Sequence, residues 1–183
     1  MARFVAFLRA INVGGHVVKM AELRAVFSAM GYAGAETFIA SGNVVFEAPD
    51  ENRASIEADV ERELTRALGY AVAAMVRTDA EVSAVATYPA FTLAEEAAAG
   101  SYSVGFLRRP LSVAERTALA SMESDIDRFS LHDAEVYWLC STRQSDSKFS
   151  AAAFERATGA TVTFRGLKTV RRLAAKYPPQ DQT

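Results

Sequence analysis

Cationic and amide side chains flank two glycine-containing segments in the first quarter of the chain. The residues that could bind a ligand there are Arg9, Asn12, Gly14, Gly15, Lys19, Ser41, Gly42 and Asn43. Free backbone N–H groups at a helix N-terminus attract anions, and arginine, lysine and asparagine side chains can donate hydrogen bonds to phosphate or carboxylate oxygens. The two segments therefore indicate a binding site for a small anionic ligand, phosphorylated molecules included, if the fold brings them together.

The same residues also have an ordinary structural interpretation. Gly14 and Gly15 can turn the chain, Asn12 can cap backbone groups, and the Gly42-Asn43 pair can form a tight hairpin turn. The loop contains neither a Gly-Lys-Ser/Thr run nor a Gly-x-Gly-x-x-Gly spacing, so it matches neither common phosphate-binding motif. Only the tertiary placement of these segments can separate the two interpretations.

The elements that position this loop occur twice in the chain. Residues 4–9 form an apolar strand pattern ending in Phe-Leu-Arg, and residues 103–108 end in the same triplet. Each is followed by an amphipathic helix, a hairpin, a second helix and another strand, which predicts the order βαββαβ twice. This is the order of the ferredoxin-like split-βαβ unit. We therefore expect a duplicated ferredoxin-like α+β fold, with one unit over 1–78, a connector helix and linker over 79–100, and a second unit with a C-terminal helix over 101–183.

Hydrophobic periodicity and turn residues predict the bounds of these elements. The expected strands are 3–9, 36–40, 44–48, 72–76, 102–108, 127–131, 135–140 and 161–164. The expected helices are 19–30, 52–68, a connector from Thr78 to about Ala86, one following Ser112, 148–157 and 167–176. Thr78 and Ser112 each precede a glutamate by three residues, which is typical of a capping box. Residues 90–100 are expected to be a linker.

The predicted topology brings the two candidate segments together. In a split-βαβ sheet the first two strands run in the same direction and the third lies between them. The loop over 9–16 and the hairpin over 41–43 therefore leave the sheet at the same end, and adjacent strands lie about 4.8 Å apart. Lys19 falls in the first turn of the following helix, where a cation is unfavourable unless an anion binds.

Two predicted strands are apolar on both faces. Residues 4–8 and 136–140 contain apolar side chains at successive positions, a pattern of strands that are buried on both sides. We expect the open sheet faces to be covered by the other half of the chain, by the connector helix or by a second copy of the protein. The sequence therefore leaves open whether the protein forms a homo-oligomer.

Composition excludes several classes of protein. The 183 residues carry a net charge of −2, with an isoelectric point near 5.8, so the basic excess of a dedicated nucleic-acid binder is missing. No apolar run reaches the roughly 18 residues of a membrane span, and no signal segment precedes the first strand. Two histidines and one cysteine, Cys140, offer no metal site, no cofactor motif occurs, and Cys140 in its apolar strand is expected to be an inert thiol. We expect a cytoplasmic protein.

A basic stripe is expected on the C-terminal helix. At 100° per residue, four cationic side chains lie within about 80° of one another, opposite an apolar face. They are Arg165, Lys168, Arg172 and Lys176. The stripe could contact phosphates, but a solvated face complementing the helix dipole is the more common use of such residues.

The first loop and hairpin resemble the signature of a bacterial family of domains of unknown function, number 1697 in that series. The resemblance is carried by residues 7–15, 19–23 and 37–46, and continues in the second half through Ser147-Lys148-Phe149-Ser150 and Thr163-Phe164-Arg165. It implies a duplicated ferredoxin-like α+β fold and no established activity or cofactor. The family pattern has glycine at the position of Ala10 and Asn-Trp at the positions of Gly166-Leu167. The second-half ligand-binding candidates are Lys148, Arg165 and Lys168.

Several functions stay open. The favoured hypothesis is a binding module for a small anion at the first loop and hairpin. An enzyme could use the same cleft, with Arg9 or Lys19 stabilising developing charge and His16 as acid or base. An RRM-like RNA-binding module agrees with the basic stripe but not with the acidic isoelectric point or the lack of an aromatic RNP-like strand. A structural or partner-binding role, and a second site near Arg108, Arg109, His132 and Asp133, also stay open.

Overall fold

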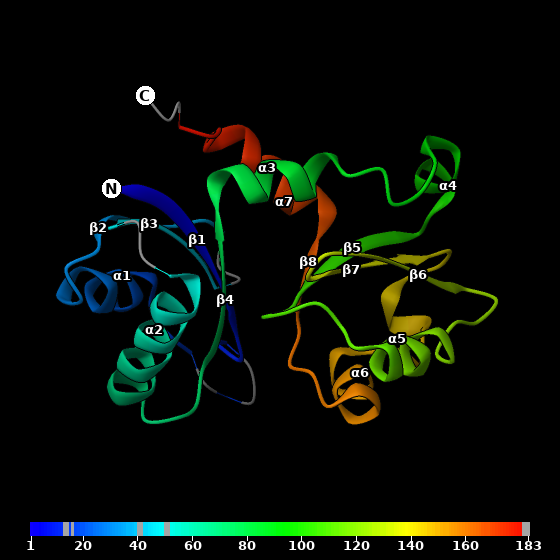
Figure 1. The fold of residues 1–183 in the computed structure, drawn as a ribbon, viewed down its shortest axis with the longest axis horizontal. Helices are drawn as coiled ribbons and strands as arrows, with labels where there is room; N and C mark the ends of the chain where they lie inside the picture. Colours follow the sequence, from blue (N-terminus) through cyan, green and yellow to red (C-terminus); the bar gives the residue numbers. More distant parts are fainter. Residues whose placement is uncertain (13–14, 16, 40–41, 50–51, 181–183) are drawn as a thin grey trace. The chain divides into compact units, whose positions relative to one another are not determined.

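Two four-stranded antiparallel sheets organise the protein, a mixed α/β structure (Figure 1). In this computed structural model the described residues are 1–12, 15, 17–39, 42–49 and 52–180. The chain divides into two compact units, one made of Met1–Ala84 with Leu173–Thr183 and the other of Val85–Arg172. Within the described ranges, no helix combines the length and the apolar character needed to cross a membrane.

The first unit is built on a sheet with the strand order β2-β3-β1-β4. Its strands are β1 (Ala2–Arg9), β2 (Ala33–Thr37), β3 (Asn43–Ala48) and β4 (Ala73–Thr78). Its helices are α1 (Met20–Ala29) and α2 (Arg53–Leu68). Every neighbouring strand pair is antiparallel. The predicted βαββαβ order is therefore present in this unit.

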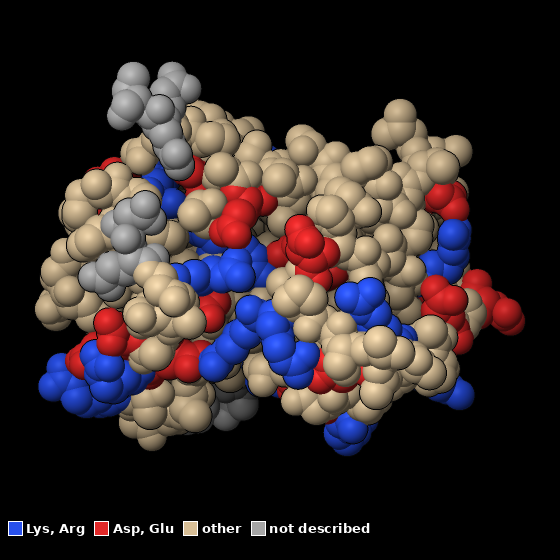
Figure 2. Space-filling view, in the orientation of Figure 1, with Lys and Arg blue, Asp and Glu red and all other residues tan. Residues whose placement is uncertain are grey.

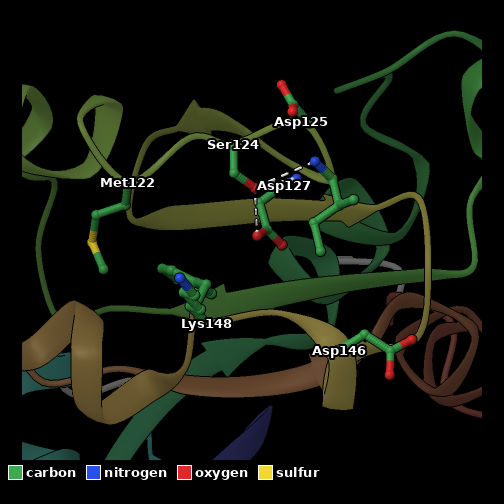
Figure 3. Close-up of a pocket in the computed structure, with 8 residues that line it drawn as sticks. Met122, Ser124, Asp125, Asp127, Asp146 and Lys148 are labelled. Carbon is green, nitrogen blue, oxygen red and sulfur yellow. Dashed lines mark hydrogen bonds between the residues drawn. The ribbon is translucent and has the colours of Figure 1, made fainter.

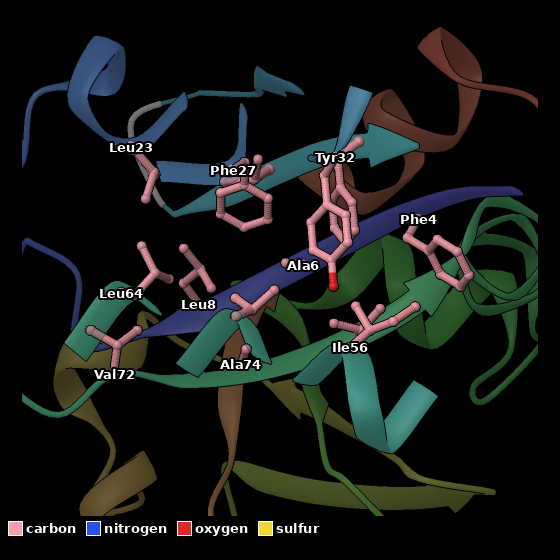
Figure 4. Packing of buried hydrophobic residues seen from close by; sticks show 14 of the residues in the cluster. Phe4, Ala6, Leu8, Leu23, Phe27, Tyr32, Ile56, Leu64, Val72 and Ala74 are labelled. Atoms are coloured by element: carbon pink, nitrogen blue, oxygen red, sulfur yellow. The ribbon is translucent and has the colours of Figure 1, made fainter. Parts of the chain in front are cut away.

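One face of the first sheet packs against both helices. Alternate residues of β1, namely Phe4, Ala6 and Leu8, join a buried cluster with Leu23 of α1 and Ile56 of α2 (Figure 4). The period of two along the strand and the helical spacing of the apolar residues place these side chains on facing surfaces. This core holds the end of β1, where the candidate loop begins.

The second unit repeats the same arrangement with the strand order β6-β7-β5-β8. Its strands are β5 (Ser101–Phe106), β6 (Asp127–His132), β7 (Glu135–Cys140) and β8 (Thr163–Gly166). The helices between them are α5 (Val113–Ala120) and α6 (Ala151–Thr158), with a short 3-10 helix η1 (Gln144–Asp146) after β7. The predicted capping box at Ser112 and Glu115 is confirmed at the start of α5. The internal repeat predicted from the Phe-Leu-Arg triplets is thus a repeat of the fold.

The chain segment that follows β4 and precedes β5 is more helical than predicted. Helix α3 (Asp79–Thr87) begins with the expected exchange of hydrogen bonds between Thr78 and Glu81. The expected linker over 90–100 is wrong, because it contains helix α4 (Leu93–Ala98). A capping box of Thr92 and Glu95 starts this helix and satisfies its first amides. The C-terminal helix α7 (Leu167–Lys176) forms where it was expected.

Both faces of the central strands are buried, as their composition predicts. Val5 and Phe7 on the second face of β1 are each 1% exposed, and Tyr137 of β7 is fully buried. In the second unit, the end of α3 and the following Tyr88 cover this face. The Tyr137 hydroxyl donates to the Val85 carbonyl (3.1 Å), and the ring centroid of Tyr88 lies 5.3 Å from that of Tyr137. One of the three expected coverings, the connector, is therefore present.

The hairpin between β2 and β3 differs from the predicted tight turn. Strand β2 ends at Thr37 rather than residue 40, and Asn43 is the first residue of β3 instead of a turn residue. The amide of Phe38 donates to the Asn43 carbonyl (2.9 Å), and the Asn43 side-chain amide donates to the Phe38 carbonyl (3.0 Å). These two hydrogen bonds close a connection longer than a two-residue turn. The side-chain amide of Asn43 donates the second bond, which the backbone amide would donate in a two-residue turn.

Candidate functional site

The end of β1 and the β2–β3 hairpin are in direct contact. The Leu8 amide donates to the Gly42 carbonyl over 2.8 Å. Gly42 has φ +74°, and a Cβ added to it would lie 3.3 Å from the Leu8 Cβ and 3.4 Å from the Ile11 Cβ. The prediction that these two segments meet at one end of the sheet is therefore confirmed.

The loop after β1 folds back onto the start of α1. The side-chain carbonyl of Asn12 accepts a hydrogen bond from the Val18 amide at 2.8 Å. Ile11 and Val18 are buried beside it, at 4% and 5% exposure. Ala10 adopts φ +66°, a left-handed conformation that favours glycine. Asn12 therefore serves the loop structure itself, as the ordinary interpretation expected.

Arg9 and Lys19 are the two cationic candidates at the ends of this loop. Arg9 is partly exposed, and Lys19 is exposed. Lys19 occupies the N-cap position of α1 and makes no side-chain capping hydrogen bond. By contrast, α2, α4, α5 and α6 are each capped by an asparagine, serine or threonine side chain. The first turn of α1 thus presents backbone N–H groups that a capping oxygen would usually satisfy.

Part of the predicted site is outside the described residues. Gly14, His16 and Ser41 belong to this group, so the structure makes no statement about them. Gly15 is described and exposed, with φ +86°. Among the described members of the predicted site, Asn12, Gly42 and Asn43 make the contacts that build this corner, and Arg9 and Lys19 adjoin residues that make them.

The second unit forms the same junction but fills the helix start with its own carboxylate. The Leu107 amide donates to the Ala134 carbonyl (2.9 Å), matching the Leu8–Gly42 contact. Arg109 donates to both carboxylate oxygens of Glu115, at 2.8 and 2.7 Å. Hydrogen bonds from Arg109, followed by the one from the Ser112 amide, lower the pKa of Glu115 to about 2. The Glu115 carboxylate therefore satisfies the start of α5, where Ser112 holds the N-cap position that Lys19 holds in α1.

The expected basic stripe is not a single helix face, because Arg165 lies on β8, paired with Val104 of β5. Its guanidinium donates to the Thr163 hydroxyl (2.8 Å) and to the Phe164 carbonyl (2.9 Å), and burial lowers its pKa to about 10. Lys168 is exposed on α7. On the surface shown in Figure 2, basic and acidic side chains are interspersed, and several described arginines form ion pairs, such as Arg53 with Glu81.

The remaining second-half candidate, Lys148, borders a cavity of about 440 Å³ (Figure 3). The residues that line it are Met122, Ser124, Asp125, Ile126, Asp127, Asp146, Lys148 and Phe149. Sequence reasoning missed the three aspartates, because no fixed spacing links them and they meet only through the fold. One sequence feature could have pointed to this site, because Asp127 lies at the start of a partly buried strand. A buried carboxylate needs hydrogen-bond donors, and serine residues flank it in the sequence.

The fold and the candidate corner define a duplicated two-sheet α/β protein with an uncapped helix start beside its first hairpin. The chain belongs to the family described as "Protein of unknown function (DUF1697)", whose model matches residues 1–137. Among solved structures it is similar to the conserved bacterial protein SP0830 from Streptococcus pneumoniae. The TM-score is 0.72 at 20% identity, over 97% of this chain and 98% of that chain. At this identity the likeness shows the fold alone. No curated protein matches the chain.

Proposed function

We propose that the protein is a binding module for a small anionic ligand, phosphorylated molecules included, which the first unit holds at the β1–α1 loop and the adjacent hairpin. Arg9 and Lys19 supply positive charge, and the first backbone amides of α1 supply hydrogen-bond donors. Asn12, Gly42 and Asn43 position these groups through the contacts described above. Such a helix N-terminus with a nearby cation is a common anion-binding arrangement in proteins.

The scaffold of this site is, in our proposal, a pair of ferredoxin-like units. The strand orders β2-β3-β1-β4 and β6-β7-β5-β8, with only antiparallel neighbours, agree with the split-βαβ topology. In that topology the β1–α1 loop and the β2–β3 hairpin always share one end of the sheet. The first unit therefore has a structural reason to place the loop and the hairpin together.

One observation carries the proposal. The hydrogen bond from the Val18 amide to Asn12 (2.8 Å) closes the loop, so that Arg9 and Lys19, ten residues apart, stand at its two ends. A lysine at an N-cap is electrostatically unfavourable on its own, because the helix dipole is positive there. A bound anion would remove this repulsion and supply an acceptor for the first amides of α1.

A thermal-shift titration of the full chain with inorganic phosphate and pyrophosphate tests the site. A ligand that binds only the native state stabilises it by about 2.7 kcal/mol at 100 times its Kd, so the midpoint should rise with concentration. Lys19→Ala should reduce this rise and leave the midpoint without ligand nearly unchanged, because the side chain is exposed. Arg9→Ala should reduce the rise as well.

Lys168→Ala is the matched control, since it removes an exposed lysine from α7 of the second unit. Its titration should follow that of the wild type. The proposal fails if neither anion raises the wild-type midpoint, or if Lys19→Ala and Lys168→Ala respond alike. If Arg9→Ala only lowers the midpoint without ligand, Arg9 stabilises the fold and does not bind the anion. The comparison of Lys19→Ala with Lys168→Ala would then test the site.

A further inference from the structure

The cavity in the second unit has the size and lining of a site for a small organic molecule. Its volume of about 440 Å³ falls within the roughly 300–1,000 Å³ typical of ligand pockets. All of its lining residues come from Met122–Phe149, so the site lies within the second unit (Figure 3). It is separate from the loop of the first unit.

Neighbouring aromatic rings hold the apolar part of the cavity lining in place. Phe149 is only 5% exposed, and its ring centroid lies 4.5 Å from that of Phe129 and 4.7 Å from that of Trp138. Met122 and Ile126 add aliphatic surface that is partly open to solvent. Because the aromatic cluster fixes the Phe149 ring, this wall can contact an apolar or aromatic ligand body without reorganising.

A buried carboxylate forms part of the same lining. Asp127 is 3% exposed, and its Oδ1 accepts from the Trp138 indole at 2.8 Å. Its Oδ2 accepts from the hydroxyls of Ser124 (2.9 Å) and Ser147 (2.7 Å). These three donors are neutral groups, so they hold the carboxylate in place without cancelling its negative charge.

The charges around the cavity favour a cationic ligand. Asp125, Asp127 and Asp146 contribute three carboxylates, and Lys148 is the one cationic residue in the lining. The Arg143 Nε lies 3.7 Å from Asp146, but the arginine side chain is 86% exposed, so solvent screens this pair. Figure 3 shows Asp125 and Asp146 on different sides of the buried Asp127. The lining therefore retains an excess of negative charge.

The spacing of the acids disfavours a metal ion as the occupant. Across the described ranges, no three histidine, cysteine, aspartate or glutamate side chains lie close enough to hold a metal. The three aspartates are therefore distributed around the cavity and do not converge on one point. Such an arrangement suits the ammonium group of an organic molecule, whose apolar part fills the remaining volume.

We propose that this cavity binds a small organic cation with an apolar or aromatic body, such as a primary arylalkyl amine. The aromatic wall formed by Phe149 contacts the body, and the carboxylates of Asp125 and Asp146 attract the ammonium group. Asp127, fixed by its serine and tryptophan partners, adds a third carboxylate at the wall, so the acidic residues of the lining outnumber Lys148.

The test compares two probes with the same phenyl ring and side-chain length but opposite charge, phenethylamine and 3-phenylpropionate. Each is titrated into the ¹⁵N-labelled full chain, with the amide shifts of Ile126, Asp127 and Phe149 as the readout. Saturable shifts with phenethylamine, and weaker or no binding of 3-phenylpropionate, are expected. Equal or tighter binding of the carboxylate overturns the proposal, and so does the lack of shifts at these amides with millimolar amine.

Asp125→Asn provides the matched variant, since it removes one rim charge and keeps the side-chain shape. It should weaken phenethylamine binding about two- to five-fold, the range expected for one exposed charge pair. The control is Asp133→Asn, which removes an equally exposed charge at the β6–β7 turn, where asparagine tolerates the φ of +47°. Equal weakening by both variants would show a non-specific charge effect and overturn the assignment to the cavity.

Discussion

The backbone amide of Leu8 donates a 2.8 Å hydrogen bond to the carbonyl of Gly42, joining the end of β1 to the hairpin before β3. The second unit makes the same bond between Leu107 and Ala134 at 2.9 Å. Beside each bond, the third strand begins with a buried polar residue, Asn43 at 1% exposure in one unit and Glu135 at 4% in the other. The duplicated contact shows that both units join the first strand to the hairpin in the same way.

Gly42→Ala should destabilise the protein. The left-handed backbone alone costs roughly 1–2 kcal/mol for a residue with a Cβ. The new Cβ would also lie 3.3 Å from the Cβ and carbonyl oxygen of Leu8. Urea denaturation should therefore show a larger loss in the free energy of unfolding than the backbone cost alone. Gly31→Ala is the control, because Gly31 has a similar φ of +82° and no atom within 4 Å of the added Cβ. Equal losses for the two variants would mean that the contact with Leu8 relaxes at no cost.

Ala10→Gly should stabilise the protein. Ala10 adopts φ +66°, and the family pattern that the sequence resembles has glycine at this position. Relief of the left-handed strain should outweigh the added entropy of the unfolded chain and raise the free energy of unfolding by about 0.5–1 kcal/mol. In Ala58→Gly, an exposed position within α2, the same replacement should instead cost about 1 kcal/mol. A loss of stability in Ala10→Gly would contradict the strained conformation.

The contact between Glu36 of β2 and Tyr177 should depend on pH. The hydrogen bond from the Tyr177 hydroxyl, opposed by partial burial and aided by the charge of Lys176, holds the pKa of Glu36 below its ordinary value of 4.5. A lowered folded-state pKa stabilises the native protein above pH 4.5, and this contribution is lost as the pH falls through the lowered value. Because the Glu36 side chain is 58% exposed, the contribution should stay below about 1 kcal/mol.

Tyr177→Phe provides the measurement for this contact. An NMR titration should show the Glu36 pKa rising towards 4.5 in the variant. The stability difference between variant and wild type should be present at pH 7 and shrink as the pH falls below 4.5 and Glu36 becomes protonated in both proteins. A difference that stays constant over this range would assign the effect to packing of the Tyr177 ring, which meets the Phe38 ring edge-on at 6.4 Å.

Ser147→Ala should destabilise the second unit. It removes one of the three neutral donors to the buried Asp127 carboxylate and the acceptor for the Phe149 amide. A buried polar group that loses its partner costs about 1–3 kcal/mol. Ser145→Ala, at an exposed position two residues away, should change the free energy of unfolding by no more than about 0.5 kcal/mol. An unchanged urea midpoint for Ser147→Ala would mean that Ser124 and Trp138 suffice to hold the carboxylate.

The order of the elements could be predicted from the sequence, because strand and helix periodicities are local. The apolar run over residues 4–8, together with the glycine after α2, predicted elements whose bounds the structure confirms within a few residues. Helix α4 was missed because it has only six residues and none of them is buried. Its start depends on the capping box of Thr92 and Glu95, a signal that composition alone does not reveal.

Only the tertiary structure determines the hydrogen-bond partners and the burial of individual polar side chains. The sequence determined a duplicated βαββαβ chain and the meeting of its first loop and hairpin, because topology follows from element order. It could not determine that Asn12 and Asn43 bond to backbone groups, that Arg165 is half-buried on β8, or that three aspartates border one cavity. Hydrogen bonding and desolvation depend on atoms distant in the chain. They are therefore fixed when the sheets and helices pack, and no spacing along the sequence encodes them.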